Sequence, residues 1–521
     1  MLEGKDSSQL VVARLLEFFA GRSSWFRGLW EVGLVLLLHE AIEAVSTSPT
    51  GALFNKALDW TGSGFKSDEG IAPRDRDILA ALLESNLHAK GGEFPALDRL
   101  TARIESEYLL RWAAWLKDAP QEKVKPERTA RAVASHLLDA GFSSNYLHRW
   151  LTYRTTHDSR VYTLAELLSE VHELVTWALP SFSVLVPVNA ALGSKAQPPK
   201  EWLDARAVSH WLAANGFKTS MRQGGGWLLD IKARDADAAA ERAAAAVERL
   251  GARLLIGAGH RQLHGEHAYV RGERMPVSLR RRRRVAVHSI ERQAQLFGQG
   301  EAMSRVDAAF ELLGQLDGPD VVAVAAGWAA IEALLSAPND ENKAAAADRL
   351  AALVACSFPR AELTLLASLQ MRQASSPLKA QLDACQSNRE RALVMAKALK
   401  SGQPSLSWGD AAQMAAVARM GALLNAPKLK LEDIRNHANR AFRRLYRQRN
   451  LVLHAGMTNS VALGACLRTS APLIGAGIDR IAHAWFVHGV EPLELSVTAT
   501  HRLSLLKDKD ADPSPLVDLL E

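Results

Sequence analysis

Apolar side chains recur every three or four residues over most of this 521-residue chain. That spacing gathers them on one face of an α-helix, whereas a half-buried strand would need strict alternation. Alanine and leucine are abundant, and long runs of β-branched residues are scarce. Because helices with one apolar face bury it by packing on other elements, the pattern predicts a mainly α fold. At about 150 residues per domain, we expect a multidomain chain with roughly three domains.

Breaks in this periodicity divide the chain into parts. Over residues 1–195 the apolar spacing predicts a helical region of unknown role, which ends near the linker-like segment Gly193–Lys200. The pattern predicts a second helical domain over residues 303–490 and a C-terminal tail over 504–521. Within the tail, Lys507–Glu521 is charged and holds two prolines, so its start is expected to be loose. The helices expected in the two helical parts are Leu10–Ala44, Ile78–Leu87, Leu97–Trp115, Thr129–Leu138, Leu164–Trp177, Val321–Leu335, Ala345–Ala355, Leu378–Leu399, Asp410–Leu424, Leu431–Leu453 and Ser460–Phe486.

Residues 200–285 have a different pattern, in which helical and strand-like segments alternate. The expected helices are Ala205–Gly216 and Asp237–Leu250, each followed or closed by glycine. We therefore predict a small central α+β module. Its expected strands are Trp227–Ala233, Arg253–Ile256 and Ala268–Arg271.

Cysteine usage and hydropathy indicate where such a chain functions. Cys356, Cys385 and Cys466 lie far apart and include no C-x-x-C pair, so they read as small core residues in a reducing compartment. The first residues, MLEGKDSSQL, do not resemble a secretory signal. The longest apolar run, Val32–Leu38, is much shorter than the ~20 residues that cross a bilayer. We expect a cytoplasmic protein with no membrane partner.

Positive charge is concentrated in two segments. The whole chain carries a formal net charge of +6, from 63 basic and 57 acidic residues. Arg271–Arg284 holds seven arginines against one glutamate, and Leu431–Asn450 holds six arginines against two acids. These segments carry +6 and +4, which leaves about −4 for the rest of the chain. Such basic clusters suit contacts with RNA phosphates, although Arg280–Arg284 also fits a solvated linker.

The most informative segment is the end of the second basic cluster. Tyr446, Asn450 and His454 are four residues apart and would stack on one face of a helix, with Arg449 beside them. Gly456 lies where a left-handed C-cap would end that helix. A guanidinium can hold a phosphate and stabilise developing charge, and an imidazole can transfer a proton at neutral pH. This combination suits metal-free attack on an RNA phosphate by the adjacent 2′-hydroxyl, with no cofactor.

Two segments resemble the HEPN superfamily. Arg449-Asn450-Leu451-Val452-Leu453-His454 matches the RN-x-x-x-H form of the R-x4-6-H motif of HEPN domains. Upstream, Trp328–Leu335 (WAAIEALL) resembles the first-helix pattern of the HEPN domains of ApeA-type anti-phage proteins. The resemblance covers about residues 303–490, a little over a third of the chain.

The resemblance implies a helical bundle that dimerises and cuts RNA without metal, leaving a 2′,3′-cyclic phosphate. By this analogy His454 acts on the proton or the phosphate, Arg449 polarises the phosphate, and Asn450 orients the motif. The chain holds one such motif, so a composite site needs two chains and a homodimer. Other expected contributors are Arg443, Arg444, Arg447 and Tyr446 as RNA contacts and Glu332 as a supporting partner of Arg449 or His454.

The family also suggests a biological role. We expect an anti-phage, abortive-infection effector that cuts RNA, with tRNA as a candidate, and a phage-derived or other protein trigger at the N-terminal region. Three alternatives stay open: a HEPN domain that binds RNA or a partner without cutting, the toxin of a HEPN/nucleotidyltransferase toxin–antitoxin pair, and a scaffold that recruits another nuclease. For the arginines near the motif, the alternative to lining an RNA groove is pairing with acidic residues on other helices. Zinc at His260, His264 and His267 with Glu266 is a further, weaker alternative, since the segment resembles a loop.

Overall fold

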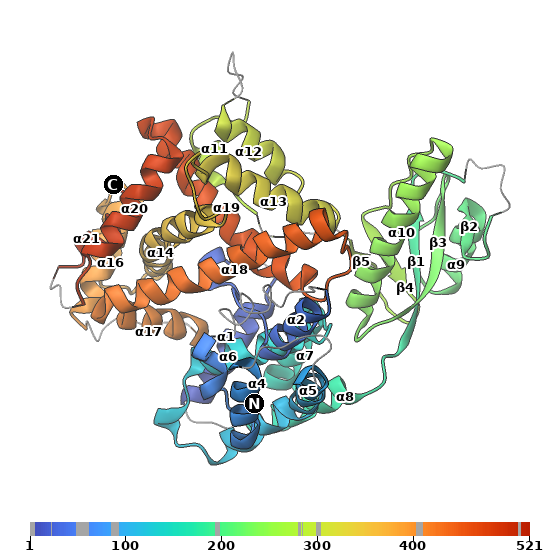
Figure 1. The fold of residues 1–521 in the computed structure, drawn as a ribbon, viewed down its shortest axis with the longest axis horizontal. Coiled ribbons are helices and arrows are strands. Elements are labelled where there is room, and N and C mark those ends of the chain that lie inside the picture. The colour runs from blue at the N-terminus through green and yellow to red at the C-terminus, as the bar shows by residue number, and fades with distance from the viewer. Residues whose placement is uncertain are drawn as a thin grey trace.

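The computed structural model describes residues 6–21, 23–47, 62–84, 93–192, 198–279, 283, 285–297, 304–402, 410–508 and 512–521. Helices dominate, and a small antiparallel sheet is set to one side (Figure 1). This confirms the prediction of a mainly α, multidomain chain. Four of the five arginines at 280–284 lie outside the described residues, so the predicted arginine strip is represented by Arg283 alone.

The N-terminal helical part packs around its own core of buried aliphatic and aromatic side chains. The predicted helix over Leu10–Ala44 is interrupted, because α1 ends at Phe19 and α2 begins at Leu34. Gly33 sits in this break: its N–H donates to Asp139, and a Cβ there would lie 3.2 Å from backbone atoms of His136. The elements are α1 (Asp6–Phe19), η1 (Trp25–Arg27), α2 (Leu34–Thr47), η2 (Gly62–Ser67), α4 (Pro73–Glu84), α5 (Glu93–Asp118), η3 (Gln121–Lys123), α6 (Pro126–Asp139), α7 (Ser144–Thr152), η4 (Tyr153–His157) and α8 (Leu164–Thr176).

The α+β module starts earlier than predicted. Its central strand, β1 (Ser181–Val188), falls inside the 1–195 segment that was expected to be helical. Within β1, Val184 and Val186 pack with the core beside α10, while Leu185 packs with the core beside α9, the alternation typical of a strand covered on both faces. The strand order is β2-β3-β1-β4-β5, from β2 (Trp202–Asp204), β3 (Gly225–Lys232), β4 (His267–Val270) and β5 (Val277–Ser278), with helices α9 (Ala205–Ala214) and α10 (Ala236–Ala258).

The predicted strand Arg253–Ile256 is wrong, because these residues belong to α10. The helix runs through Gly251 and ends at Gly259, whose φ of 69° gives a left-handed cap. Gly251 is needed for close packing, since a Cβ there would lie 3.0 Å from the carbonyl oxygen of Gln262. A glycine expected to stop the helix is therefore a contact point inside it.

The C-terminal bundle is built around α14, whose neighbours are α13, α16, α18, α19 and α20. Among the described helices, α14 is the one long and apolar enough to cross a membrane, but 72% of its apolar window is buried, as in the core helix of a soluble protein. The predicted helix Leu378–Leu399 is divided by a new N-cap at Ser387. The elements are α11 (His288–Arg292), α12 (Arg305–Leu313), α13 (Asp320–Leu335), α14 (Ala345–Arg372), α15 (Lys379–Ala384), α16 (Asn388–Lys400), α17 (Ala411–Asn425), α18 (Pro427–Ala455), α19 (Leu463–His488), α20 (Pro492–Leu505) and α21 (Ser514–Val517).

The end of the chain belongs to this bundle: the last residues of the predicted tail 504–521 are docked, while residues 509–511, near the start that was expected to be loose, lie outside the described residues. Leu516, Val517, Leu519 and Leu520 are buried in the bundle core. Arg389 holds the Asp518 carboxylate with two hydrogen bonds of 2.7 and 2.5 Å. The apolar run Leu516–Leu520 is the sequence signal for this docking, and charge and proline content obscure it.

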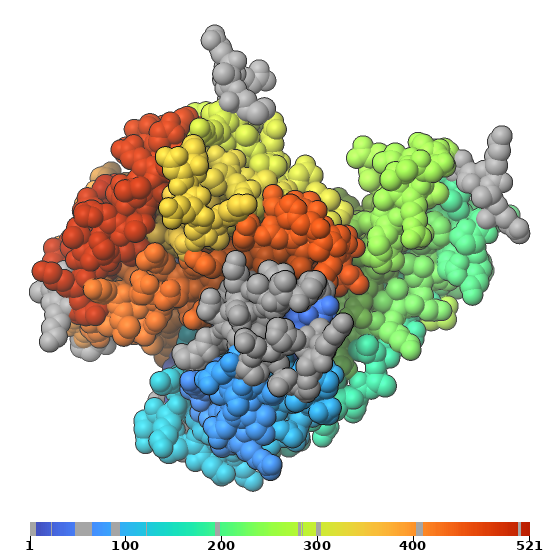
Figure 2. All heavy atoms as spheres, viewed as in Figure 1, coloured from blue at the N-terminus to red at the C-terminus, as the bar shows by residue number. Residues whose placement is uncertain are grey.

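The N-terminal part and the C-terminal bundle share a buried interface. Phe26 and Trp30 belong to the bundle's core, although the rest of their region packs elsewhere. Val32 and Leu36 pack with Ala462 and Ala465 at the start of α19. In Figures 1 and 2 the two helical parts are continuous, whereas the α+β module stands apart across an open hollow at one edge. The two predicted helical parts are therefore not independent of each other.

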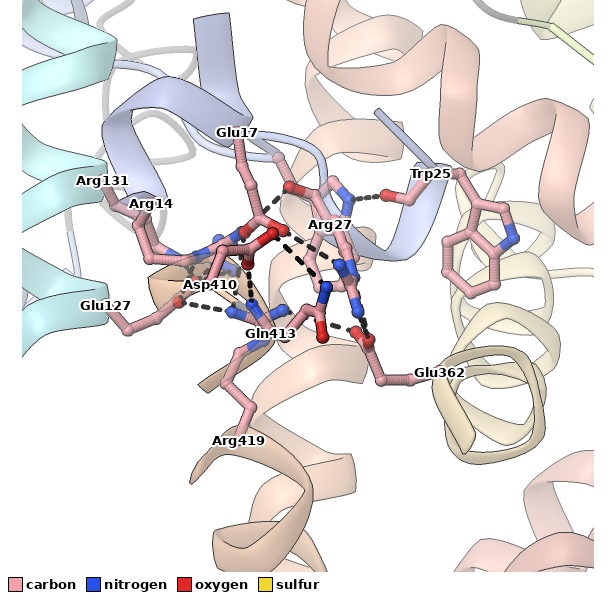
Figure 3. Close-up of polar contacts among 11 residues, drawn as sticks. Arg14, Glu17, Trp25, Arg27, Glu127, Arg131, Glu362, Asp410, Gln413 and Arg419 are labelled. Atoms are coloured by element: carbon pink, nitrogen blue, oxygen red, sulfur yellow. Dashed lines mark hydrogen bonds and ion pairs between the residues drawn. The ribbon is translucent and has the colours of Figure 1, made fainter. Parts of the chain in front are cut away.

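A buried charge network joins the same two parts (Figure 3). Arg27 donates two hydrogen bonds, of 2.8 and 2.6 Å, to one carboxylate oxygen of Glu362 on α14. Arg14 on α1 is held by Glu127 on α6 at 2.7 and 2.9 Å. Arg419 on α17 reaches the other oxygen of Glu362 at 3.4 Å. The network comprises Arg14, Arg27, Arg131, Arg419, Glu17, Glu127 and Glu362.

Candidate functional site

The predicted motif lies at the C-terminal end of α18, a 29-residue helix. Its buried stripe, which includes Ala441, Phe442 and Leu445, packs into the bundle core between α13, α14 and α19. The helix ends at Gly456, which has a φ of 65° and is therefore the left-handed cap that the sequence predicts. Packing and cap together fix where the last turn of α18 presents its side chains.

Arg449, Asn450 and His454 come together over the last two turns of α18. Nη1 of Arg449 donates to Oδ1 of Asn450 and to Nε2 of His454, each at 3.0 Å. Because a guanidinium has no acceptor atom, Nε2 must accept in this geometry, which leaves the ring proton on Nδ1. His454 is exposed, and Arg449 and Asn450 are half-buried. The structure thus brings an open imidazole and a guanidinium into direct contact at the surface.

Tyr446 and Glu332 do not join this contact. The Tyr446 ring packs on the fully buried Trp328 of α13, with ring centroids 4.8 Å apart. Tyr446 is therefore a packing contact between α13 and α18, which differs from its expected role against RNA. Glu332, also on α13, is half-buried, and among the described residues no hydrogen bond or ion pair links it to Arg449 or His454. The supporting role expected for Glu332 is absent from this geometry.

Arg443 is at the surface but is already paired. Its guanidinium donates to both carboxylate oxygens of Asp348 on α14, at 3.0 and 3.1 Å. Its side chain is 39% exposed, so the pair is only partly shielded from water. This agrees with the alternative that the motif's neighbouring arginines pair with acids on other helices, and it leaves one face of the guanidinium open to a ligand.

Arg444 and Arg447 are buried, which contradicts their predicted place on an open RNA-binding rim. Arg444 donates to Oε2 of Glu40 at 3.2 Å, and Arg447 donates to the backbone oxygen of Glu40 at 3.0 Å. Glu40 belongs to α2 and is 1% exposed. Burial lowers the pKa of the Arg447 guanidinium, and the nearby Glu40 opposes this shift. In this conformation the N-terminal part covers both arginines.

Glu40 is the site-adjacent residue that the sequence analysis missed. It follows the apolar run Val32–Leu38, and a carboxylate next to such a run must be paired if it is buried. That pattern signals a buried partner for Glu40 but gives no means of locating it 404 residues away in α18.

The histidine cluster of the α+β module is not arranged around a metal. His264 contacts the Gly265 carbonyl oxygen at 2.7 Å and Glu248 at 3.3 Å, so both ring nitrogens have partners. In the described part of the chain, no three His, Cys, Asp or Glu side chains are grouped so that they could hold a metal ion. His260, His267 and Glu266 therefore form no metal site with His264 in this geometry.

A cavity of about 540 Å³ lies where the three parts meet. Its walls include Trp30, Arg242 of α10 and Arg468 of α19. Arg468 is paired with Asp139 at 2.7 Å, and Asp139 also lines the cavity. The size suits a small molecule, but the paired charges select no particular ligand.

Comparison of the chain with protein-family models, with curated proteins and with solved structures finds no match.

Proposed function

We propose that this protein is a metal-independent endoribonuclease whose site is the Arg449–Asn450–His454 cluster of a HEPN-type C-terminal bundle. The observation that supports this most is the 3.0 Å contact between the Arg449 guanidinium and Nε2 of the exposed His454. A phosphate-binding cation and a proton-transfer group are thus adjacent, open to solvent and fixed by a capped helix end.

The proposed reaction begins when an RNA phosphate replaces His454 as the partner of Arg449. The guanidinium then neutralises charge on the nonbridging oxygens, and Nε2 of His454 becomes free to accept a proton. His454 removes the 2′-hydroxyl proton, and the 2′-oxygen attacks phosphorus. The P–O5′ bond breaks, the 5′-oxygen takes up a proton, and the products carry a 2′,3′-cyclic phosphate and a 5′-hydroxyl.

One chain supplies one imidazole, whereas this reaction uses a base and an acid. We therefore propose a homodimer in which two α18 ends meet, so that one His454 removes the proton and the other protonates the leaving group. Asn450 would orient Arg449 through the hydrogen bond between them. A cytoplasmic anti-phage effector, with an N-terminal part that receives the trigger, is the biological role that fits this chemistry.

The experiment compares wild type with Arg449→Ala and His454→Ala on total RNA and tRNA in EDTA. Each variant should lower the cleavage rate about 10²–10⁴-fold. His488→Ala is the matched control, because His488, like His454, is exposed in the last turn of a long helix that ends at a left-handed glycine, here α19 and Gly489. If wild type binds the RNA but does not cut it, the binding-only alternative replaces this proposal.

A further inference from the structure

Three glutamates from one N-terminal segment lie against the basic side of α18. We call residues 31–43, which contain Glu31, Glu40 and Glu43, the acidic segment. Glu40 makes the closest set of contacts: beyond its hydrogen bonds with Arg444 and Arg447, Oε1 accepts from the Gln448 amide at 3.3 Å. The Glu40 carboxylate, at 1% exposure, is thus paired with Arg444 at 3.2 Å and with Arg447 at 3.6 Å, and it accepts from the amide.

Glu43 and Glu31 extend this contact in both directions. Glu43 accepts from the Ser460 hydroxyl at 2.7 Å and from the backbone N–H of Val461 at 3.1 Å, just before α19 begins. Glu31 pairs with His437, nearly three turns before Arg447 on α18. Burial raises the pKa of Glu31, but His437, Arg131 and Arg440 outweigh it and lower the pKa to about 2, so Glu31 stays anionic at neutral pH.

The covered and the open parts of α18 belong to one face of the helix. Arg447 and His454 are seven residues apart, which is two helical turns and about 10 Å along the axis. Arg443 and Asn450 complete the same stripe, with spacings of four, three and four residues. The acidic segment covers this stripe at Arg447 and leaves it open at His454.

The groups beneath the acidic segment are those that proteins use to hold nucleic-acid backbones. Guanidiniums, side-chain amides, hydroxyls and free backbone N–H groups are the usual donors to phosphate oxygens. Here all four kinds are present, and glutamate carboxylates occupy them. A carboxylate resembles a phosphodiester because each offers Arg a pair of anionic oxygens that accept two hydrogen bonds.

We propose that the covered stripe of α18 is an RNA-backbone-binding surface and that the acidic segment occupies it as an internal RNA mimic. This rests on the proposed nuclease function and specifies its regulation. In the resting protein the catalytic end of α18 is open, but the phosphates on the 5′ or 3′ side of the cut have no binding surface. A trigger that moves α2 exposes Arg444 and Arg447, and RNA then binds along α18.

The test measures binding of a short, fluorescent 2′-O-methyl oligoribonucleotide, which cannot be cut, to the full-length protein. Glu40→Gln removes the charge and keeps the shape of the side chain, so it should shift the population toward the uncovered state and tighten binding at least about tenfold. Two freed arginines should also steepen the dependence of log K on log salt by about 1.4, at 0.7 per single-strand phosphate contact.

Glu105→Gln is the matched control, because Glu105 contacts His39 of the same helix α2 at 3.0 Å on an exposed side away from α18. It should leave RNA affinity unchanged. The double variant Glu40→Gln/Arg447→Gln should lose part of the gain, since Arg447 is one of the proposed phosphate contacts. If Glu40→Gln folds like wild type and binds the oligonucleotide no more tightly, the inference is wrong.

If Glu40→Gln does not fold, Glu43→Gln decides the question, since its half-buried carboxylate anchors the same segment through the Ser460 hydroxyl and the Val461 N–H. A gain in affinity supports the mimic, and no gain contradicts it. Binding of uncut RNA is separate from cleavage. Tighter binding by the variants with no cleavage of natural RNA would reject the nuclease alone, while cleavage without tighter binding would reject the mimic alone.

Discussion

Glu362 offers the sharpest test of how the N-terminal part is fastened to the bundle. Its carboxylate is fully buried on α14 and is held by Arg27 at 2.6 Å and Arg419 at 3.4 Å (Figure 3). The side chains of Arg27 and Arg419 are only 10% and 15% exposed. Removing the shared carboxylate charge leaves two poorly hydrated cations close together, and breaking a buried pair from one side costs about 3–5 kcal/mol.

Glu362→Gln should show the lower end of that range, because the amide oxygen can still accept a hydrogen bond from Arg27. We expect a loss of about 3 kcal/mol in the free energy of unfolding. With a urea m-value of about 2–3 kcal/mol/M, the first unfolding midpoint should fall by about 1 M or more. Tryptophan fluorescence can follow this transition, since Trp25 and Trp30 lie at the interface concerned.

The double variant Arg27→Met/Glu362→Met removes both partners and should cost less than the sum of the two single changes, with an interaction energy of up to about 3 kcal/mol. Glu107→Gln is the control: it breaks an exposed i,i+4 pair with Arg111 and should change stability by about 0.5 kcal/mol or less. If Glu362→Gln unfolds within about 0.5 kcal/mol of wild type, the network of Figure 3 does not hold the two parts together.

Two further predictions concern pH and the helix end. Burial lowers the pKa of His136 from 6.5 to about 4. On acidification the unfolded chain therefore takes up this proton before the folded protein does, and the free energy of unfolding should fall by about 3 kcal/mol between pH 6.5 and 4. Urea unfolding at several pH values should show this fall, and His136→Gln should reduce it. Gly456→Ala should cost about 1–2 kcal/mol at a φ of 65° and also reduce RNA cleavage, because it disturbs the end that presents His454. Gly489→Ala, at a φ of 64° on the end of α19, should lower the free energy of unfolding by a similar amount and leave RNA cleavage unchanged. Equal cleavage rates for the two variants would contradict the role of the α18 cap.

Local signals in the sequence predict much of the fold. The apolar periodicity predicts the mainly α architecture, and the end of α18 at Gly456 follows from glycine's tolerance of positive φ. β1 was missed because eight residues of alternation in SFSVLVPV are a weaker signal than the long helical pattern before it. α10 was cut short because Gly251 resembles a helix stop, while its actual role, close contact with Gln262, depends on the tertiary fold.

Some residues of the candidate site are likewise predicted by local sequence, whereas others depend on the tertiary fold. Arg449, Asn450 and His454 lie within six residues of one helix, so helical geometry alone brings them together. The sequence around Arg444 and Arg447 is the same whether the two arginines are exposed on a basic surface or buried. Their burial is decided by Glu40, which approaches from the other end of the chain, and hydrophobic periodicity contains no information about that contact.

The most direct test of the central claim is cleavage of tRNA and total RNA in EDTA by purified full-length wild type, Glu40→Gln, and Glu40→Gln combined with His454→Ala, read on a denaturing gel. We expect wild type to cleave the RNA and leave 2′,3′-cyclic phosphate ends, Glu40→Gln to increase this cleavage, and the combined variant to show none on the gel. Cleavage that persists without His454, or RNA that stays intact with every protein although Glu40→Gln binds it, would contradict the claim that α18 carries an RNA-cleaving site.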